Sequence, residues 1–401
     1  MTIVTDAILR PIPMRVVVAA DSFKGSLSAP EACAALGRGL ARAIPALDLR
    51  LRPMADGGEG TLDAILAAIG DAAQRKIVDV RGAGGAPVAA AYGLVPHPVG
   101  LTAVVEVAQV VGITDATAMA TAIGGRSTRG VGDLLVALLD MGVRRFMIGL
   151  GGSSTNDGGS GLLETLGLAL FDNAGRALVP TPNGLASLAR VDASALDPRI
   201  AECDIRIMSD VNNPLTGAMG ATAIFGPQKG VRREDIETFD ATLGRFAKLA
   251  ENALGRSVEQ RPGAGAAGGL GFAFALLGGS FSSGAEVVAE LIGLDAALAD
   301  ADWAITGEGR SDRQTLLAKA PFVVAQHAAA RGVPVTLVSG AIDPAALADL
   351  GAHFAGCFGL PHGPATLPDS IANAAQLLEE RAVEIGRVFQ AGHGAPRRTV
   401  K

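Results

Sequence analysis

The charged side chains of this chain gather in short glycine-rich segments, several of which follow apolar, strand-like runs. Five segments share this layout: residues 15–26, 49–61, 146–159, 205–214 and 303–312. An apolar run followed by glycine and by Asp, Lys, Glu, Asn or Arg places polar groups at the carboxyl end of a strand, where open α/β sheets bind ligands. So many segments of this kind in one chain indicate an anionic ligand together with a metal.

The segment 149–159, GLGGSSTNDGG, is the strongest of the five. Its glycine and hydroxyl residues supply N–H and O–H groups that can cradle phosphate oxygens. A purely structural turn does not require this density of glycine and polar residues. Asn156 and Asp157 can coordinate a metal or position a hydroxyl. The candidate phosphate-binding residues are Gly151, Gly152, Ser153, Ser154, Thr155 and Asn156.

Two loops nearer the N-terminus add a cation and two carboxylates. Lys24 lies in the turn 21–26 and suits a phosphate or carboxylate, aided by N–H groups at the start of the next helix. An ordinary turn capped by serine is the alternative. Asp56 and Glu59 stand three residues apart in a glycine loop and can hold Mg²⁺ directly or through water. A capping arrangement for the helix at Thr61 explains these two carboxylates equally well.

Polar groups also close the strand that ends near residue 208. Asp210, Asn212 and Asn213 follow this strand, and Lys229 lies just beyond them. An acidic group and a lysine on neighbouring loops suit a substrate hydroxyl and an anion. An Asx turn followed by a surface lysine is nearly as good an explanation.

The segment after the apolar run at 303–306 carries an arginine between two acids. Arg310 offers a planar fork for carboxylate or phosphate, and Glu308 and Asp312 flank it. The alternative is a local Arg–Asp pair that stabilises the turn. Lys319 follows about two helical turns later.

Several familiar motifs are absent or out of context. Gly263–Gly268 matches G-x-G-x-x-G, but no strand is expected before it. The sequences GxxxxGK[ST] and GxSxG do not occur, and the five histidines show no metal-ligand spacing. These observations argue against a zinc site and weaken a hydrolase interpretation.

Bulk composition predicts a folded protein with two domains. The 401 residues exceed what one hydrophobic core usually serves, since domains cluster near ~100–150 residues, and 49% hydrophobic content excludes global disorder. The net charge of −6 and the low aromatic content of 4% argue against a nucleic-acid partner. Cys33, Cys203 and Cys357 stand alone, which is typical of buried thiols in a reducing compartment.

The sequence also argues against a membrane protein. The first 13 residues carry Asp6, Arg10 and two prolines, where a signal peptide needs an unbroken apolar stretch. The uncharged stretches 82–105 and 262–285 are broken by prolines or rich in glycine, unlike a span of ~20 apolar residues. We therefore expect a cytoplasmic protein with neither a membrane nor a nucleic-acid partner.

Both ends of the chain alternate strands with helices, which implies parallel, right-handed units. Strands are expected over 14–20, 47–54, 302–308, 333–340 and 354–360, and helices over 30–44, 61–69, 321–331, 344–350 and 371–389. In the middle, strand follows strand with few long helices, which favours a mixed sheet with antiparallel pairs.

We expect an α/β protein with a doubly wound parallel-sheet domain of the Rossmann or flavodoxin-like kind. This discontinuous domain comprises residues 1–70 plus 286–401. A second α/β domain of mixed sheet, residues 71–285, is inserted into it, with the active-site cleft between them. A sequential split near residue 200 is the alternative.

Taken together, these segments resemble the glycerate kinase family of the bacterial type that forms 2-phosphoglycerate. The matching blocks occur in order between about residues 14 and 385: DSFKGSLSA, MADGGEGT, GLGGSSTNDGG, SDVNNPL, FGPQKG, PGAGAAGGLG and TGEGRSD…QT…KAP. The resemblance implies transfer of the γ-phosphoryl group of ATP to a hydroxyl of D-glycerate, with Mg²⁺. The chain departs from the expected pattern at Ser311, Arg313 and Ala318, where we expect an apolar residue, a small residue and a glycine.

Phosphoryl transfer rests mostly on positioning and charge stabilisation, which gives each candidate residue a role. Lys24 and the 151–159 loop would hold the nucleotide phosphates, and the metal candidates are Asp157, Asp56 and Glu59. The proton acceptor would be Asp210 by preference, or Asp312. The catalytic candidates are Asp210, Asp312, Lys24 and Arg310. The substrate-binding candidates are Asp21, Ser22, Asn212, Lys229, Arg310 and Glu308, with Arg310 or Lys229 gripping the glycerate carboxylate.

Two rival functions remain at this stage. An NAD(P)-dependent hydroxy-acid dehydrogenase needs a glycine fingerprint after the first strand, which this chain lacks. A non-catalytic sugar-acid-binding protein leaves the 151–159 loop unexplained. The sequence does not determine which hydroxyl is phosphorylated or which sugar acid is preferred. A homodimer is one expected arrangement, although the sequence does not fix the oligomeric state.

Overall fold

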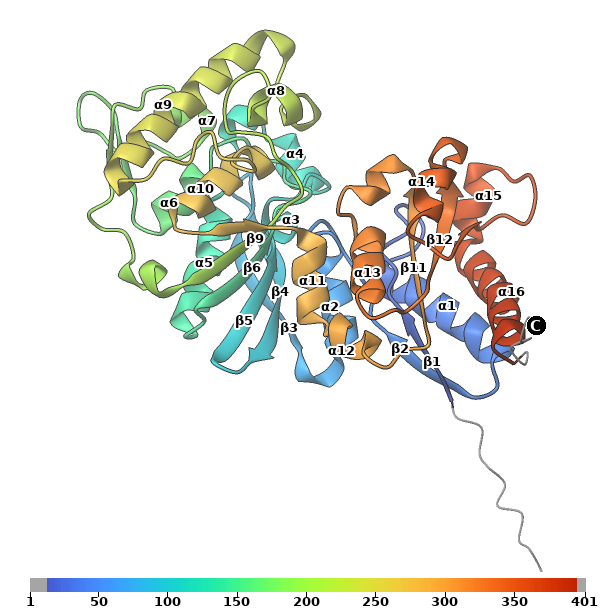
Figure 1. The fold of residues 1–401 in the computed structure, drawn as a ribbon. Coiled ribbons are helices and arrows are strands. Elements are labelled where there is room, and N and C mark those ends of the chain that lie inside the picture. The colour runs from blue at the N-terminus through green and yellow to red at the C-terminus, as the bar shows by residue number, and fades with distance from the viewer. Residues whose placement is uncertain (1–12, 395–401) are drawn as a thin grey trace, which may run out of the picture. The chain divides into compact units, whose positions relative to one another are not determined.

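The computed structural model describes residues 13–394, which pack as two compact units (Figure 1). The first unit comprises the residues up to Ala55, Asp63–Ala68 and the residues from Ala289 onward. The second comprises Asp56–Leu62 and Ile69–Val288. The expected domain boundaries and the cleft between the domains stay predictions.

The first unit is built on a five-stranded parallel sheet in the order β13-β12-β11-β1-β2. Its strands are β1 (Met14–Val18), β2 (Leu47–Leu51), β11 (Trp303–Ser311), β12 (Val335–Ile342) and β13 (Gly356–Gly359). Its helices are α1 (Ala29–Ala43), α12 (Leu294–Leu298), α13 (Ala320–Ala329), α14 (Leu347–Gly351), α15 (Leu367–Ala372) and α16 (Ala374–Gly394). The order is the flavodoxin-like one, which confirms the expected fold class.

Local sequence signals explain where the first helix of this unit begins. Ser28 caps α1 as part of a capping box with Glu31, and Pro30 occupies the first turn. The apolar face of α1 and that of α16 pack into one core with β1 and β11, and Trp303 stacks on Phe389 with ring centroids 4.2 Å apart.

The largest difference from the expected elements of this unit concerns β11. The apolar run was expected to end the strand at 308, but β11 continues through Ser311, and Glu308 pairs with Ser339 of β12. Gly307 permits this extension, since an added Cβ there would lie 2.0 Å from the Val338 carbonyl oxygen. The polar segment is therefore part of the sheet.

The second unit is built on a six-stranded sheet in the order β10-β9-β6-β5-β4-β3. Antiparallel pairs join β3 (Gln74–Arg81), β4 (Pro87–His97) and β5 (Gly100–Glu106), and parallel pairs join β5, β6 (Arg145–Gly149), β9 (Asp204–Met208) and β10 (Ser280–Ser282). This is the mixed sheet that the sequence predicts. A separate antiparallel pair joins β7 (Ala169–Phe171) and β8 (Arg190–Asp192).

Some helices of the second unit lie beside this sheet, and others lie beyond one end of it (Figure 1). They are α3 (Ala108–Val111), α4 (Ala116–Ala120), α5 (Arg129–Asp140), α6 (Ser160–Thr165), α7 (Pro182–Leu185), α8 (Ala221–Phe225), α9 (Ile236–Leu254) and α10 (Leu270–Leu276). Two further helices, α2 (Thr61–Ile69) and α11 (Gly284–Leu291), have residues in both units.

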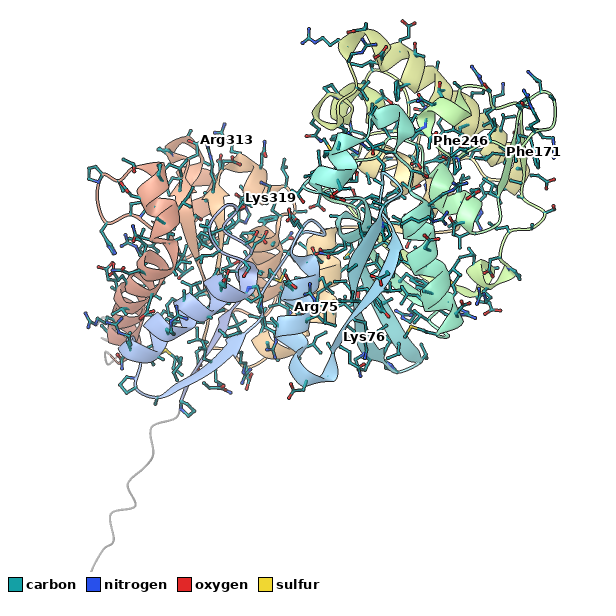
Figure 2. The ribbon with its side chains drawn as sticks, turned by 180° about the vertical axis from the view of Figure 1, so that it is seen from behind. Arg75, Lys76, Phe171, Phe246, Arg313 and Lys319 are labelled. Atoms are coloured by element: carbon teal, nitrogen blue, oxygen red, sulfur yellow. The ribbon has the colours of Figure 1, made fainter. Side chains whose placement is uncertain are left out.

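Charged side chains protect one edge of the second sheet. Figure 2 shows Arg75 and Lys76 on β3, the edge strand, and both are exposed. Charged residues on an edge strand disfavour pairing with another chain. Among the described residues, no helix is both long and apolar enough to cross a bilayer.

Candidate functional site

The first unit brings the ends of β1 and β11 together at its topological switch point, where sheets of this kind bind ligands. The Asp21 N–H donates to the Gly307 carbonyl over 2.9 Å, so the turn after β1 lies against β11. An added Cβ on Gly309 would lie 3.1 Å from the backbone nitrogen of Lys24. Ser22 is half-buried and Lys24 is exposed.

A buried carboxylate with hydroxyl partners lies beside this turn. Glu308 is 7% exposed, and its Oε1 accepts from Thr315 Oγ1 at 2.6 Å and from Ser311 Oγ at 2.9 Å. Ser311 Oγ is also 2.7 Å from Ser339 Oγ. Burial is the main cause of the raised pKa of Glu308, and the two hydroxyl donors oppose it.

The two charged residues that follow have different surroundings. Arg310 is 72% exposed, and its Nε is 4.0 Å from Asp312 Oδ2. Asp312 caps a 3-10 turn, since its Oδ1 accepts from the Gln314 N–H at 2.8 Å. The local Arg–Asp pair weighed as an alternative is thus long, and Arg310 is accessible to a ligand.

In the second unit, the polar side chains after β6 are buried. Ser154, Thr155, Asn156 and Asp157 have 0% exposure, and Ser153 has 5%. Glycines make this packing possible: an added Cβ on Gly158 would lie 2.9 Å from the Phe246 ring, which Figure 2 labels. The side chains predicted to bind phosphate therefore face the protein interior.

The carboxylate of Asp157 accepts four hydrogen bonds from donors of its own unit. It accepts from the Thr128 N–H and Oγ1, both at 2.8 Å, from the Gly159 N–H at 3.0 Å and from the Gly161 N–H at 3.3 Å. The donors lie at the starts of α5 and α6, where a carboxylate stabilises helix N-termini. Burial raises the pKa of Asp157. Its predicted metal role stays a prediction.

Two buried cations hold the same loop from inside. Lys229 is 2% exposed, and its Nζ donates to Ser153 Oγ at 2.8 Å and to the Thr155 carbonyl at 2.9 Å. Arg126 Nη1 donates to the carbonyls of Ser154 and Lys229, at 2.9 and 3.0 Å. Burial lowers the pKa of Lys229 to about 7.

The start of this loop offers backbone groups, and Gly152 there is exposed. Within residues 13–394, the N–H groups of Gly151, Gly152 and Ser153 make no hydrogen bond, and Gly152 has a φ of 71°. Consecutive N–H groups at a left-handed residue form a concavity that binds anions. This backbone is what the loop offers to a phosphate.

Close backbone contacts hold the loop of Asp56 and Glu59 in the second unit. An added Cβ on Gly151 would lie 2.7 Å from Gly58 Cα, and one on Gly284 would lie 1.9 Å from the Asp56 carbonyl oxygen. Asp56 Oδ1 accepts from the Gly58 N–H at 3.1 Å, and Glu59 is exposed. Both carboxylates retain oxygens for a ligand.

The end of β9 lies at the same edge of this sheet. Asp210 is exposed, and its Oδ1 accepts from the Gly284 N–H at 3.4 Å. Asn212 is also exposed, whereas Asn213 donates to the Met219 carbonyl at 2.7 Å. The structure thus places the predicted residues in two sets, one at the strand ends of each unit.

Several polar residues of these sets were not among those predicted from the sequence. Ser339 ends an expected strand, so the layout used for the other sites also fits it. Glu106 likewise ends β5, is 3% exposed and accepts from the Leu62 N–H at 2.8 Å. Arg126 and Thr128 follow no strand, and only their glycine-rich surroundings could have signalled them.

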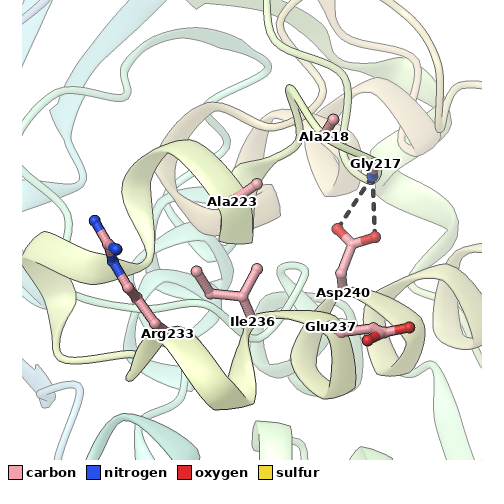
Figure 3. Close-up of a pocket in the computed structure, with 7 residues that line it drawn as sticks. All are labelled: Gly217, Ala218, Ala223, Arg233, Ile236, Glu237 and Asp240. Atoms are coloured by element: carbon pink, nitrogen blue, oxygen red, sulfur yellow. Dashed lines mark hydrogen bonds between the residues drawn. The ribbon is translucent and has the colours of Figure 1, made fainter.

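A surface pocket of about 540 Å³ lies elsewhere in the second unit (Figure 3). Asp240 in this pocket accepts twice from the Gly217 N–H, at 3.1 and 3.0 Å. Its lining residues are Gly217, Ala218, Ala223, Arg233, Ile236, Glu237 and Asp240, and none of them belongs to the predicted site.

A flavodoxin-like sheet and a mixed sheet, each with polar groups at its strand ends, define an α/β protein of the class that binds ligands at the carboxyl ends of its strands. The chain belongs to the glycerate kinase family, whose model matches residues 16–390. This match confirms the resemblance seen in the sequence.

Individual relatives agree with this assignment. The chain is 40% identical over 375 residues to a glycerate kinase of Bacillus subtilis (strain 168), covering 93% of this chain and 97% of that protein. It is 39% identical over 330 residues to glycerate 2-kinase of Escherichia coli (strain K12), covering 82% of this chain and 86% of that protein. A crystal structure from Salmonella typhimurium LT2, provisionally assigned as glycerate kinase 2, matches with a TM-score of 0.84 and 38% identity, covering 96% of this chain and 100% of that one.

Proposed function

We propose that this protein transfers the γ-phosphoryl group of ATP to a hydroxyl of D-glycerate and forms 2-phosphoglycerate. The observation that carries the proposal is the family match over residues 16–390. The choice of the 2-hydroxyl is supported by the similarity to the Escherichia coli protein, which is named glycerate 2-kinase.

The nucleotide phosphates would bind at the unpartnered N–H groups of Gly151, Gly152 and Ser153, with Lys24 as a cation beside them. The unpartnered backbone donors fit an anion, and the exposure of Lys24 fits a role toward a ligand. Ser154, Thr155 and Asn156 would support the loop from within, because their side chains are buried.

Magnesium would be held by Asp56 and Glu59, which retain carboxylate oxygens for it. Mg²⁺ usually binds one or two carboxylates together with substrate phosphates, so a small protein ligand set suffices. The ion would offset charge on the transferring phosphoryl group. Asp157 fits this role less well, because four protein donors already bind its carboxylate.

The glycerate carboxylate would bind Arg310, the accessible arginine at the switch point. Asp21, Ser22 and Asn212 are further substrate contacts in this proposal. Lys229, the other candidate, is buried, and both hydrogen bonds of its Nζ go to acceptors within the second unit. Asp210 and Asp312 were the expected proton acceptors.

The protein would act in the cytoplasm on a small-molecule substrate, and a homodimer stays a prediction. That both sets of residues serve one reaction is part of the proposal.

Phosphorus NMR tests the proposal directly. Purified protein is incubated with Mg-ATP and D-glycerate, and we expect ADP together with the resonance of 2-phosphoglycerate. L-Glycerate and D-lactate serve as matched substrate controls. A 3-phosphoglycerate resonance would overturn the position, and the absence of any phosphorylated acid would overturn the kinase function. An absorbance change with NAD(P)⁺, or glycerate binding without ATP consumption, would instead favour one of the rival functions.

A further inference from the structure

We propose that Glu308 takes the proton from the attacking hydroxyl of the substrate. Three hydroxyl side chains fix its carboxylate so that the proton arrives at Oε2. This inference rests on the proposed kinase function and names the base of that reaction.

The position of Glu308 is the first support. It lies on β11 at the topological switch point of the first unit, next to the turn that carries Lys24. Gly307 and Gly309 flank it and allow the turn after β1 to pack closely against this part of β11. Ligands of sheets with this order bind at the switch point.

The directions of the hydrogen bonds are the second support. The Thr315 hydroxyl accepts from the Asp312 N–H at 3.1 Å, and its own proton goes to Glu308 Oε1. The Ser311 proton also goes to Oε1, so the Ser339 hydroxyl must be the donor in the Ser339–Ser311 pair. Thr315 and Ser311 thus donate to Oε1 directly, and Ser339 donates to Ser311.

This polarity determines where a proton can be taken up. Oε1 already accepts two hydrogen bonds, and a proton there would displace a donor. Oε2 accepts no hydrogen bond within residues 13–394, and Glu308 keeps 7% exposure. The carboxylate is therefore anchored through one oxygen and can accept a proton through the other.

The surroundings also tune Glu308 as a base. Burial raises its pKa, whereas Thr315, Ser311 and the charge of Lys319 lower it and the charge of Asp312 raises it. A base with a raised pKa accepts a proton more readily than an exposed carboxylate. Asp312 itself uses Oδ1 as a helix cap, which leaves it less suited to this step.

The hydroxyl O–H bond of glycerate breaks, and its proton moves to Glu308 Oε2. The hydroxyl oxygen forms a new bond to the γ-phosphorus of ATP, and the bond from that phosphorus to the bridging oxygen breaks with its electron pair leaving on ADP. Glu308 then releases the proton to solvent.

The test compares Glu308→Gln with Ser311→Ala, using Glu384→Gln on α16 as the control for an exposed carboxylate. Steady-state kcat and KM for glycerate are measured between pH 5 and 9, with the thermal midpoint of each variant. We expect Glu308→Gln to lower kcat about 100-fold or more while KM changes less than about threefold. Its amide oxygen can still accept from Thr315 and Ser311, so the thermal midpoint should stay near that of the unaltered protein.

Ser311→Ala tests the pH dependence of kcat, which would not change if Glu308 had only a structural role. Loss of a donor to the carboxylate raises the pKa of Glu308, so the acidic limb of the kcat profile should shift to higher pH by about 0.5–1 unit. Should Glu308→Gln fail to fold, this shift alone decides. The inference would be overturned if the unaltered enzyme is active and the Glu308→Gln variant keeps more than a tenth of its kcat. It would also be overturned if the substitution raises KM and leaves kcat unchanged. An unshifted limb in Ser311→Ala would overturn it as well. An inactive unaltered protein would instead overturn the proposed function.

Discussion

After β6, in the second unit, the charged side chains turn inward, whereas after β1 and along β11, in the first unit, several stay accessible. Asp157, and Lys229 that reaches the same loop from the turn 227–229, are 0% and 2% exposed, and both form hydrogen bonds with buried neighbours. Lys24 is exposed and Arg310 is 72% exposed. The loop after β6 thus presents backbone N–H groups to a ligand, whereas the turn after β1 and the end of β11 present side chains.

This difference separates charges that build a site from charges that act in it. A buried charge is tolerated only when hydrogen bonds compensate its desolvation, so removing it costs stability first. An accessible charge costs little to remove and affects mainly the ligand. The two kinds of region should therefore respond to substitution in opposite ways.

The largest expected effect is on the stability of Asp157→Ala. Four donors, including N–H groups at the starts of α5 and α6, would lose their acceptor. We expect a loss of about 3 kcal/mol or more in the free energy of unfolding, measured by urea titration. Asp210→Ala, at an exposed carboxylate, is the control and should unfold like the unaltered chain. Normal stability combined with a raised Mg²⁺ requirement would instead support the metal role.

Lys24→Ala should show the opposite pattern. The side chain is exposed, so the thermal midpoint should change little. Loss of a cation that offsets phosphoryl charge should lower kcat/KM for ATP about 100-fold. Lys248→Ala, at an exposed lysine on α9, is the matched control. Equal kcat/KM values for the two variants would remove Lys24 from the site.

A smaller effect concerns the pH dependence of stability at Lys229. Burial lowers its pKa to about 7 from an ordinary value of 10.5, so between these values the unfolded chain binds more protons than the folded one. Stability should therefore rise with pH across this window, by at most about 1.4 kcal/mol per pH unit from this group. Urea unfolding at pH 7 and pH 9 measures the rise. Lys229→Met should reduce it, and an unchanged rise in that variant would show that Lys229 is not its source.

The smallest effect concerns backbone strain at alanines with a positive φ, which is tested at Ala318 near the end of β11. Ala267 and Ala318 have φ values of 54° and 60°, in the left-handed region that favours glycine. Ala318→Gly should stabilise the protein by about 0.5–1 kcal/mol, seen as a higher thermal midpoint. Ala330→Gly, at a φ of −59°, should do the reverse. A lower midpoint in Ala318→Gly would show that the loop does not retain strain.

Sequence patterns predicted most of the fold, because strands of both sheets are apolar runs bounded by glycine or charge. The departure noted at Ala318 also has a structural counterpart, since the expected glycine position has a positive φ. The pattern placed polar residues at strand ends but could not tell which way they point. Asp157 and Lys24 look alike as charges in glycine-rich loops, and only packing separates them.

The sequence pattern likewise did not predict where β11 ends. Glycine and charge usually end a strand, yet Gly307–Ser311 pairs with β12 because the glycines admit close backbone contacts. The roles of Arg126 and Thr128 depend on contacts between distant segments, which spacing along the chain does not reveal.

The order of strands in the first unit also has a consequence for biosynthesis. β11 lies between β1 and β12, yet more than 280 residues separate its start from the end of β1. During translation, β1 and β2 must wait with one edge unpaired until the whole second unit has left the ribosome. Closing so long a loop is slow, and an unpaired strand edge invites aggregation. Nascent chains halted before residue 303 should therefore recruit chaperones at β1.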